Sequence, residues 1–159
     1  NTEWLLAKAQ QVTAVDLSES MLAKAREKIV SDRVRFAQAD VNQAWNFAKG
    51  PYDLVTFSLV LEHIEDLDPI FEKVRQVLAL GGYVYVGELH PFKQYGGSKA
   101  RFQTDRGTQI VTCYNHHVSD FLGAALKQGL RLLALEERFD DEDRNGIPRI
   151  LSLLLQRPA

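Results

Sequence analysis

Residues 12–28 read VTAVDLSESMLAKAREK, a short apolar run followed at once by a helical pattern. The run Val12–Leu17 is typical of a buried strand in a parallel sheet, and it carries an acid, Asp16, near its end. Ser18 is a suitable helix N-cap, and Glu19 lies in the first turn, where the helix dipole favours a negative charge. This stretch therefore predicts a strand that leads directly into a capped helix. Met21 and Leu22 are expected on the apolar face of that helix.

The alternation of strands and helices continues along the chain. Further strands are predicted at Val34–Ala39, Tyr52–Ser58 and Tyr83–Glu88, and helices at Asp68–Leu78, ended by Gly81-Gly82, and at Ser119–Gln128. Two final apolar runs, Leu130–Arg138 and Arg149–Gln156, are separated by a short acidic turn and predict an antiparallel hairpin. We therefore expect one α/β domain over residues 1–159, with a doubly wound, mostly parallel sheet and a C-terminal antiparallel hairpin.

The overall composition excludes several classes of protein. The formal net charge of −2 gives no strong field that would attract nucleic acid. No apolar run approaches the roughly 18 residues of a membrane span. The single cysteine, Cys113, excludes an internal disulfide and suits a reducing compartment. We expect a cytoplasmic protein without a nucleic-acid partner or membrane span, whose oligomeric state the sequence does not indicate.

Polar residues end the predicted parallel strands, at the edge where such sheets bind ligands. Asp16 ends the first strand, where an acid can accept hydrogen bonds from ribose hydroxyls, although it could instead cap or solvate the strand end. Leu17, the next residue, could cover one face of an adenine. Asp40, with the backbone of Val41, could meet the exocyclic amine of that adenine. Two acids that end successive strands favour a nucleoside site over a structural role.

Two further strands complete this edge of the predicted sheet. Ser58 ends the third strand, and we expect Ser58 and Leu59 to line the same cleft as Asp40. Glu88 ends the fourth strand, and the sequence assigns it no role.

Three segments together resemble class I S-adenosylmethionine-dependent methyltransferases, in particular those of the ubiquinone/menaquinone-biosynthesis type. They are VTAVDLSESMLAKAREK, VRFAQADVNQAW and YDLVTFSLVLEHIEDLDPIFEKVRQVLALGGYVYV. Each motif is weak, but their order and spacing are fairly specific. The resemblance implies a Rossmann-like fold, S-adenosylmethionine as the cofactor and transfer of its methyl group to a small-molecule acceptor.

The chain departs from this family in one respect. The family's first strand and its glycine-rich loop, which holds the methionine part of the cofactor, have no counterpart in the sequence. That strand lies centrally in the family's sheet, between those predicted at Val12–Leu17 and Tyr52–Ser58. We expect upstream residues to supply it, so that the chain is an N-terminally truncated methyltransferase domain.

The segment 89–117 is predicted to fold over the strand ends as a substrate lid, because it is long, polar and irregular. It holds the candidate acceptor-binding residues His90, Tyr95 and Tyr114 and the candidate catalytic residues His116 and His117. Histidine titrates near neutral pH and could deprotonate an acceptor, although for each of these histidines taken singly a structural role is the favoured interpretation. Their spacing matches no common zinc motif, and we expect no metal site.

Two other functions remain open on the sequence alone. A nicotinamide-dependent oxidoreductase could also end its second strand with an acid such as Asp16, but the terminal hairpin fits it poorly and no Tyr-x-x-x-Lys pair is present. A non-catalytic protein that keeps the fold and binds a partner is harder to exclude. Cofactor binding would separate these alternatives from a methyltransferase.

Overall fold

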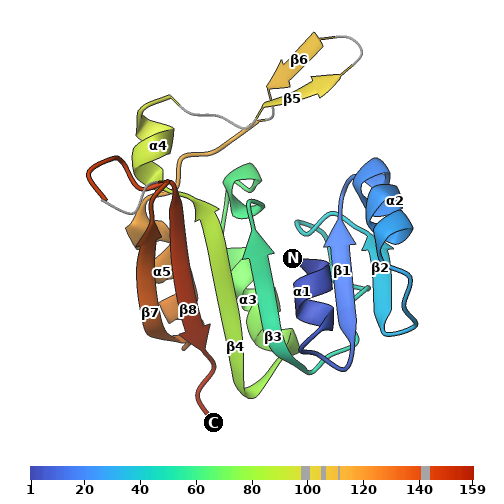
Figure 1. Ribbon diagram of the computed structural model, residues 1–159. Helices are drawn as coiled ribbons and strands as arrows, with labels where there is room; N and C mark the ends of the chain where they lie inside the picture. The colour runs from blue at the N-terminus through green and yellow to red at the C-terminus, as the bar shows by residue number, and fades with distance from the viewer. Residues whose placement is uncertain (98–100, 105–106, 111, 141–143) are drawn as a thin grey trace. The chain divides into compact units, whose positions relative to one another are not determined.

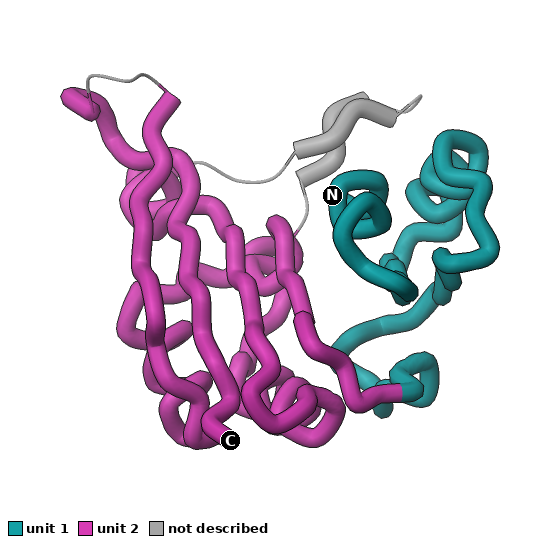
Figure 2. Tube along the Cα trace, turned by 60° about the horizontal axis from the view of Figure 1, so that its bottom comes forward, with its two compact units in different colours: residues 1–49 teal, residues 50–159 magenta. Residues whose placement is uncertain are grey.

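The computed structural model describes residues 1–97, 101–104, 107–110, 112–140 and 144–159, with the side chains of 101–110 left out of the description. The chain forms two compact units, Asn1–Lys49 and Gly50–Ala159, drawn in teal and magenta in Figure 2. Each unit contains a parallel pair of strands, so the predicted α/β class is observed in both.

The first unit is built around the stretch that predicts the strand and capped helix. Its elements are α1 (Thr2–Leu6), β1 (Val12–Asp16), α2 (Glu19–Lys28) and β2 (Val34–Gln38). Strands β1 and β2 are parallel and in register from the pair Val12–Val34 to the pair Asp16–Gln38. The predicted cap is present, because the Ser18 hydroxyl accepts a hydrogen bond from the backbone N–H of Met21 at 3.3 Å.

One side chain of this helix differs from the prediction. Leu22 is buried at 3% exposure, whereas Met21 is 54% exposed and faces away from the apolar side. Successive residues of a helix point about 100° apart, so Met21 cannot share the buried direction of Leu22 when that side is narrow.

The second unit contains the larger sheet. Its elements are β3 (Tyr52–Ser58), the 3-10 helix η1 (Leu61–His63), α3 (Asp68–Val77), β4 (Leu78–Leu89), α4 (Pro91–Tyr95), β5 (Arg101–Thr104), β6 (Gly107–Ile110), α5 (Val118–Lys127), β7 (Arg131–Arg138) and β8 (Ile150–Gln156). Figure 1 shows the order β3-β4-β8-β7, with α3 and α5 against one face of this sheet. The predicted antiparallel hairpin is confirmed as β7–β8.

The core of the second unit lies on the face that α3 and α5 cover. Along β4, Val84 and Val86 are 0% exposed, whereas Tyr83 and Tyr85 are 42% and 37% exposed on the other face. The buried side chains that complete this core come from α3, α5 and β8: Ile70, Phe71, Val74, Phe121, Ala124, Ala125, Leu151, Leu153 and Leu155. The alternation along β4 therefore decides which residues are inside.

The predicted end of the third helix is wrong. The glycine pair does not end α3, which stops at Val77, and Gly81 lies inside β4 with φ of +76°. The guanidinium of Arg157, far along the chain, donates to the carbonyls of Arg75 at 2.8 Å and Leu78 at 2.5 Å. It thereby satisfies carbonyl groups at the helix end, which a C-terminal glycine motif would otherwise serve.

The segment 89–117 is more regular than predicted. It contains the short helix α4 and the antiparallel pair β5–β6, while residues 98–100, 105–106 and 111 lie outside the described part. His90 starts α4, because its Nδ1 accepts a hydrogen bond from the backbone N–H of Phe92 at 3.2 Å.

The parallel strands of the two units belong to separate sheets. Among the described residues, β1 forms a ladder with β2, and β3 forms a parallel ladder with β4. No ladder between β1 and β3 is present in the described sheets. The additional strand expected between them stays a prediction.

We predict that Phe71→Ala destabilises the second unit strongly. Phe71 is 0% exposed and its ring lies 6.5 Å from that of Phe57, so truncation leaves a cavity in the core. We expect a loss of about 3–5 kcal/mol in the free energy of unfolding, measured with urea. As a control, Leu80→Ala at a 68% exposed position should change it by less than about 0.5 kcal/mol. Equal effects of the two changes would contradict this description of the core.

Candidate functional site

In the first unit, the predicted nucleoside-binding acids lie at the same edge of a parallel pair. Asp16 ends β1, and its carbonyl accepts a hydrogen bond from Ala39 at 3.2 Å, directly before Asp40. Each carboxylate uses Oδ1 to accept from a backbone N–H two residues on, Ser18 at 2.8 Å for Asp16 and Asn42 at 2.9 Å for Asp40. In the described structure, the second oxygen of each carboxylate has no protein partner and remains able to accept.

The residues that follow the two acids differ in exposure. Leu17 is 67% exposed, which is unusual for a leucine directly after a strand and leaves an apolar surface beside Asp16. Its carbonyl accepts from the Gln38 side chain at 3.1 Å. Val41 is half-buried, and its carbonyl accepts from the indole N–H of Trp45 at 2.9 Å. Leu17 therefore offers its side chain to a ligand. Val41 offers its backbone, which is already held in place by neighbouring residues.

In the second unit, the chain turns sharply where β3 ends. Ser58 is exposed, and Leu59 is 50% exposed with φ of 55°, in the left-handed region. This conformation costs a residue other than glycine about 1–2 kcal/mol. The N–H of Leu59 donates to the carbonyl of Gly87 at 2.9 Å, which ties the turn to β4. Strained backbone of this kind is concentrated at functional sites.

Glu88, to which the sequence assigns no role, lies directly behind this turn. Its two carboxylate oxygens each lie 3.1 Å from the N–H of Val60, and Oε2 lies 3.4 Å from the N–H of Glu62. Burial raises the pKa of Glu88 to about 7, against the lowering effect of these backbone donors and that of Leu61. The sequence does contain the relevant pattern, since Glu88 continues the alternating row of Val84 and Val86.

The 3-10 helix after the turn carries a second buried acid. Glu62 is 4% exposed, and its Oε2 has no hydrogen-bond partner in the part of the chain that the structure describes. Its carbonyl accepts from the N–H of Tyr114 at 2.8 Å, and His63 Nδ1 lies 3.0 Å from the carbonyl of Thr112. Residues 112–114 therefore lie against η1, and Tyr114 is held there by its backbone.

Two of the predicted site histidines are buried and already hydrogen-bonded. His90 is 1% exposed; its Nδ1 accepts within α4 and its Nε2 lies 3.0 Å from Glu137 Oε1, so Nε2 carries the proton and donates. His116 is 6% exposed and its Nε2 donates to the carbonyl of Ile64 at 2.7 Å. Both geometries favour the structural alternative for these two residues.

The structure brings the two other predicted residues together on the surface. Tyr95 is 51% exposed, and its hydroxyl lies 2.5 Å from Nδ1 of His117, which is also exposed. The Phe92 ring, 53% exposed, lies 6.2 Å from the Tyr95 ring, which in turn lies 5.6 Å from the His117 ring. An exposed aromatic surface with a tyrosine–histidine hydrogen bond thus joins α4 to the start of α5.

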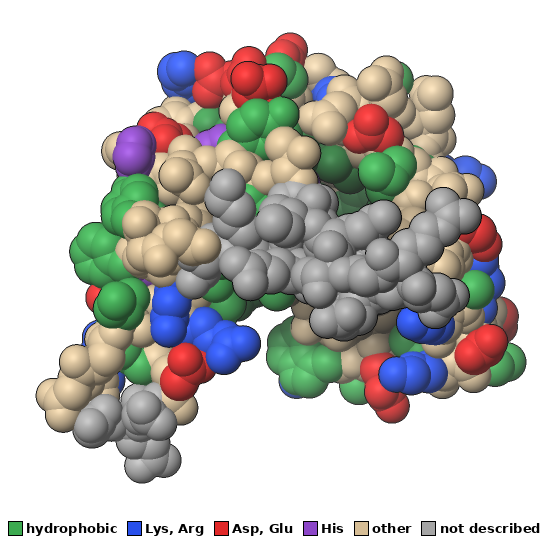
Figure 3. All heavy atoms as spheres, turned by 90° about the horizontal axis from the view of Figure 1, so that it is seen from above, with side chains coloured by type: hydrophobic (Ala, Val, Ile, Leu, Met, Phe, Trp, Pro, Cys, Tyr) green, Lys and Arg blue, Asp and Glu red, His purple; other side chains and the backbone are tan. Residues whose placement is uncertain are grey.

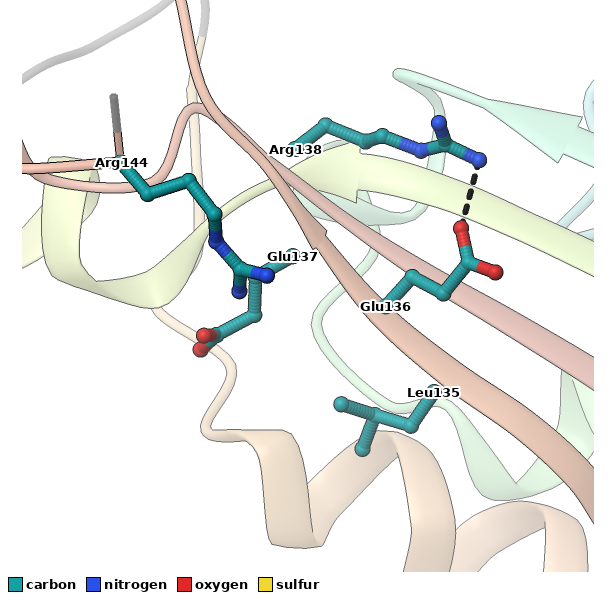
Figure 4. A pocket seen from close by; sticks show the side chains of 5 residues that line it. All are labelled: Leu135, Glu136, Glu137, Arg138 and Arg144. Atoms are coloured by element: carbon teal, nitrogen blue, oxygen red, sulfur yellow. Dashed lines mark hydrogen bonds and ion pairs between the residues drawn. The ribbon is translucent and has the colours of Figure 1, made fainter. Parts of the chain in front are cut away.

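A pocket elsewhere in the second unit lies along the edge strand β7. Figure 4 shows Leu135, Glu136, Glu137, Arg138 and Arg144 around it, with an ion pair of 2.5 Å between Arg138 and Glu136. Of its charged lining residues, Glu136 pairs with Arg138 and Glu137 pairs with His90, whereas the Arg144 guanidinium lies over the Phe139 ring. Through β8, Glu137 lies level with Glu88, so the pocket lies at the same edge of the sheet as the end of β4, with β8 between the two strands.

Charges of both signs are interspersed over the face seen in Figure 3, with apolar side chains between them. Among the described residues, no group of three or more histidine, cysteine, aspartate or glutamate side chains is placed to hold a metal ion. Within the same residues, no helix is both long enough and apolar enough to cross a membrane.

Sequence comparison places the chain within a known family. The profile of a family described as methyltransferase domain matches residues 1–86, more than half of the chain, and the chain belongs to this family. The demethylmenaquinone methyltransferase of Bacteroides fragilis is 31% identical over 84 residues, which are 50% of this chain and 34% of that protein. The ubiquinone/menaquinone biosynthesis C-methyltransferase of Shewanella woodyi is 28% identical over 122 residues, 74% of this chain and 44% of that protein. The chain therefore spans less than half the length of either relative.

Comparison with solved structures agrees on the fold. An S-adenosylmethionine-dependent methyltransferase from Mesorhizobium loti matches with a TM-score of 0.80 at 21% identity, covering 98% of this chain and 85% of that one. At this identity the likeness shows the fold alone, and it confirms the predicted Rossmann-like class.

We predict that Glu88→Gln removes a pH dependence of stability. The folded-state pKa of about 7 exceeds the ordinary value of 4.5, so the folded protein binds this proton more tightly than the unfolded chain does. The resulting stabilisation is fully present below pH 4.5 and is lost as the pH rises through 7, by about 3 kcal/mol. The neutral amide of Gln does not titrate, so the stability of this variant has no such pH-dependent contribution at position 88. Urea unfolding across this range should give a difference between wild type and variant that changes with pH, and a constant difference would refute the assignment.

Proposed function

We propose that the full-length protein transfers a methyl group from S-adenosylmethionine to a small-molecule acceptor. Membership of the methyltransferase domain family supports the activity. The observation that carries the proposal is the pair Asp16, the last residue of β1, and Asp40, two residues beyond the end of the parallel strand β2. Each keeps one carboxylate oxygen without a protein partner in the described structure. We further propose that both units belong to one domain, because the matched residues 1–86 run across the boundary after Lys49.

The residues of the first unit fit the nucleoside part of this cofactor. We assign the ribose hydroxyls to the second carboxylate oxygen of Asp16, since acceptors of this kind bind ribose in dinucleotide folds. The exposed side chain of Leu17 would cover an adenine face, and Asp40 with the backbone of Val41 would receive its exocyclic amine. In the second unit, Ser58 and Leu59 are the proposed cofactor-binding residues, both exposed where β3 ends.

The chemistry needs alignment more than acid–base assistance. When bound, S-adenosylmethionine supplies a methyl group activated by its sulfonium. The protein's part is to hold the acceptor atom in line and to exclude water, so positioning contributes most of the rate. A general base is required where the acceptor must first lose a proton.

We propose that the acceptor binds against the segment 89–117, where the exposed surface of Phe92, Tyr95 and His117 is available to a ligand. Of the two candidate bases, His117 is better placed than His116, whose Nε2 is committed to Ile64. In the tautomer in which His117 Nδ1 donates to the Tyr95 oxygen, Nε2 can take a proton from the acceptor. His90 and Tyr114 would act by shaping this region rather than by touching the reacting atom.

The acceptor is proposed to be a small molecule rather than nucleic acid, because charges of both signs are mixed and the formal net charge is −2. We place the protein in the cytoplasm, because Cys113, the single cysteine of the sequence, suits the reducing conditions there.

We predict that Asp16→Ala weakens the binding of S-adenosylhomocysteine by about 1.5–3 kcal/mol, the usual loss when a hydrogen bond to a charged group is removed. Isothermal titration calorimetry on the full-length protein measures this. Asp32→Ala is a matched control, because Asp32 is an exposed acid in the turn before β2. Wild-type affinity in Asp16→Ala would show that the ribose site is misplaced. If the wild-type protein bound NAD instead of S-adenosylhomocysteine, an oxidoreductase would be indicated.

We predict that His117→Ala lowers turnover by about a hundredfold or more, if a proton must be removed, while cofactor affinity is kept. Tyr95→Phe should lower turnover less, since it removes the hydroxyl but leaves the imidazole. His116→Ala should chiefly reduce stability, because it leaves the Ile64 carbonyl buried without its donor. Release of S-adenosylhomocysteine in the presence of the acceptor is the assay, and thermal unfolding separates the two effects. Full turnover in both histidine variants would remove the pair from the mechanism.

A further inference from the structure

The last inward-facing position of β4 holds a carboxyl group inside the core. Glu88 is 0% exposed, in the same row as Val84 and Val86. Its ladder partner on β8, Leu151, is also 0% exposed. An apolar side chain would fill this position without the desolvation that a carboxylate suffers. An acid here therefore requires a compensating interaction.

The compensating interaction comes from the backbone of the turn after β3. The N–H of Val60 lies 3.1 Å from each oxygen of Glu88, and the N–H of Glu62 lies 3.4 Å from Oε2. These donors directly follow Leu59, whose left-handed conformation is unfavourable for a leucine. Because such a conformation persists only when its surroundings hold it, the turn depends on β4.

We infer that Glu88 is a positioning residue that holds the turn Leu59–Glu62 in the conformation that binds the cofactor. The inference rests on the proposed function, in which Leu59 contacts that cofactor. The backbone behind Leu59 is fixed by Glu88, while its side chain is 50% exposed and available to a ligand. The same contact fixes Glu62, whose buried Oε2 has no partner among the described residues. Glu88 acts on ligand binding through these two neighbours.

The turn can be released without opening the core. Glu88→Met keeps an unbranched side chain of similar length, and its thioether is only a weak hydrogen-bond acceptor, so it removes the carboxylate contact with Val60 and Glu62 while keeping the position filled. Glu88→Asp is one methylene shorter and draws the carboxylate back, which provides a second disrupting variant should the first fail to fold. Glu88→Gln keeps an acceptor oxygen and is the conservative variant. Glu72→Gln, on the exposed face of α3, is the matched control.

Two measurements on the full-length protein test the inference. Both are made at about pH 8, where most of the Glu88 carboxyl groups are ionised. Hydrogen exchange of the Val60 and Glu62 amides without ligand reports the contact itself. Calorimetric binding of S-adenosylhomocysteine reports its consequence.

We expect faster exchange at both amides in Glu88→Met and Glu88→Asp, with affinity reduced about tenfold or more, as for loss of hydrogen bonds to a charged acceptor. Glu88→Gln should retain affinity within about threefold, because Oε1 still accepts from the turn. Glu72→Gln should behave as wild type in both measurements.

Unchanged exchange in the disrupting variants would overturn the inference, because the contact would then not hold the turn. Faster exchange with wild-type affinity would also overturn it, since the turn would not serve the ligand. A wild-type protein that binds no S-adenosylhomocysteine would instead defeat the proposed function, and the exchange measurement would still decide whether Glu88 holds the turn.

Discussion

Strand β4 pairs with β3 along one edge and with β8 along the other, and these two ladders fix which side chains enter the core of the second unit. Because side chains alternate along a strand, the register that buries Val84 and Val86 must bury Glu88 as well. A slip of one residue would bring Tyr83 and Tyr85 inside and expose the carboxyl group. The burial of Glu88 is therefore a property of the whole sheet rather than of its local sequence.

The acids that end parallel strands in this chain have two different environments. Asp16 is exposed, and one of its carboxylate oxygens has no partner in the described structure. Glu88 is buried and uses both oxygens on the backbone of a neighbouring segment. The two-stranded sheet of the first unit, with Leu22 as its buried helix residue, offers little interior in which to place a charge. The four-stranded sheet, covered by α3 and α5, does have an interior that can hold a carboxyl group. The same strand-end position can thus serve a ligand directly or serve the backbone that meets it.

Local rules predicted much of the fold. The run Tyr52–Ser58 forms a strand with the predicted bounds, and the hairpin β7–β8 follows from two apolar runs too close for a helix between them. The cap at Ser18 also follows from local chemistry. The end of α3 could not be predicted in this way, because the Arg157 guanidinium that satisfies its last carbonyls comes from the far end of the chain.

The candidate site was less predictable for the same reason. Its acids could be located because strand ends are visible in sequence, but the left-handed conformation of Leu59 depends on contacts with another strand. Likewise, the alternation along β4 indicates that Glu88 is buried but not that the backbone of Val60 lies against it. Tertiary contacts of this kind decide which of several suitable residues has a functional geometry.

The adjacent residues His116 and His117 make this point most sharply. Both precede α5, and the sequence treats them as equivalent candidates for a base. At the start of the helix, the His116 ring points inward, where the Phe121 ring lies 5.5 Å away and the Ile64 carbonyl accepts a hydrogen bond from Nε2. The His117 ring points outward to Tyr95. A base must exchange its proton with a ligand, and a ring that is 6% exposed with a committed Nε2 is poorly suited to this. The opposite orientations of these two adjacent side chains therefore separate a structural histidine from a candidate catalytic one.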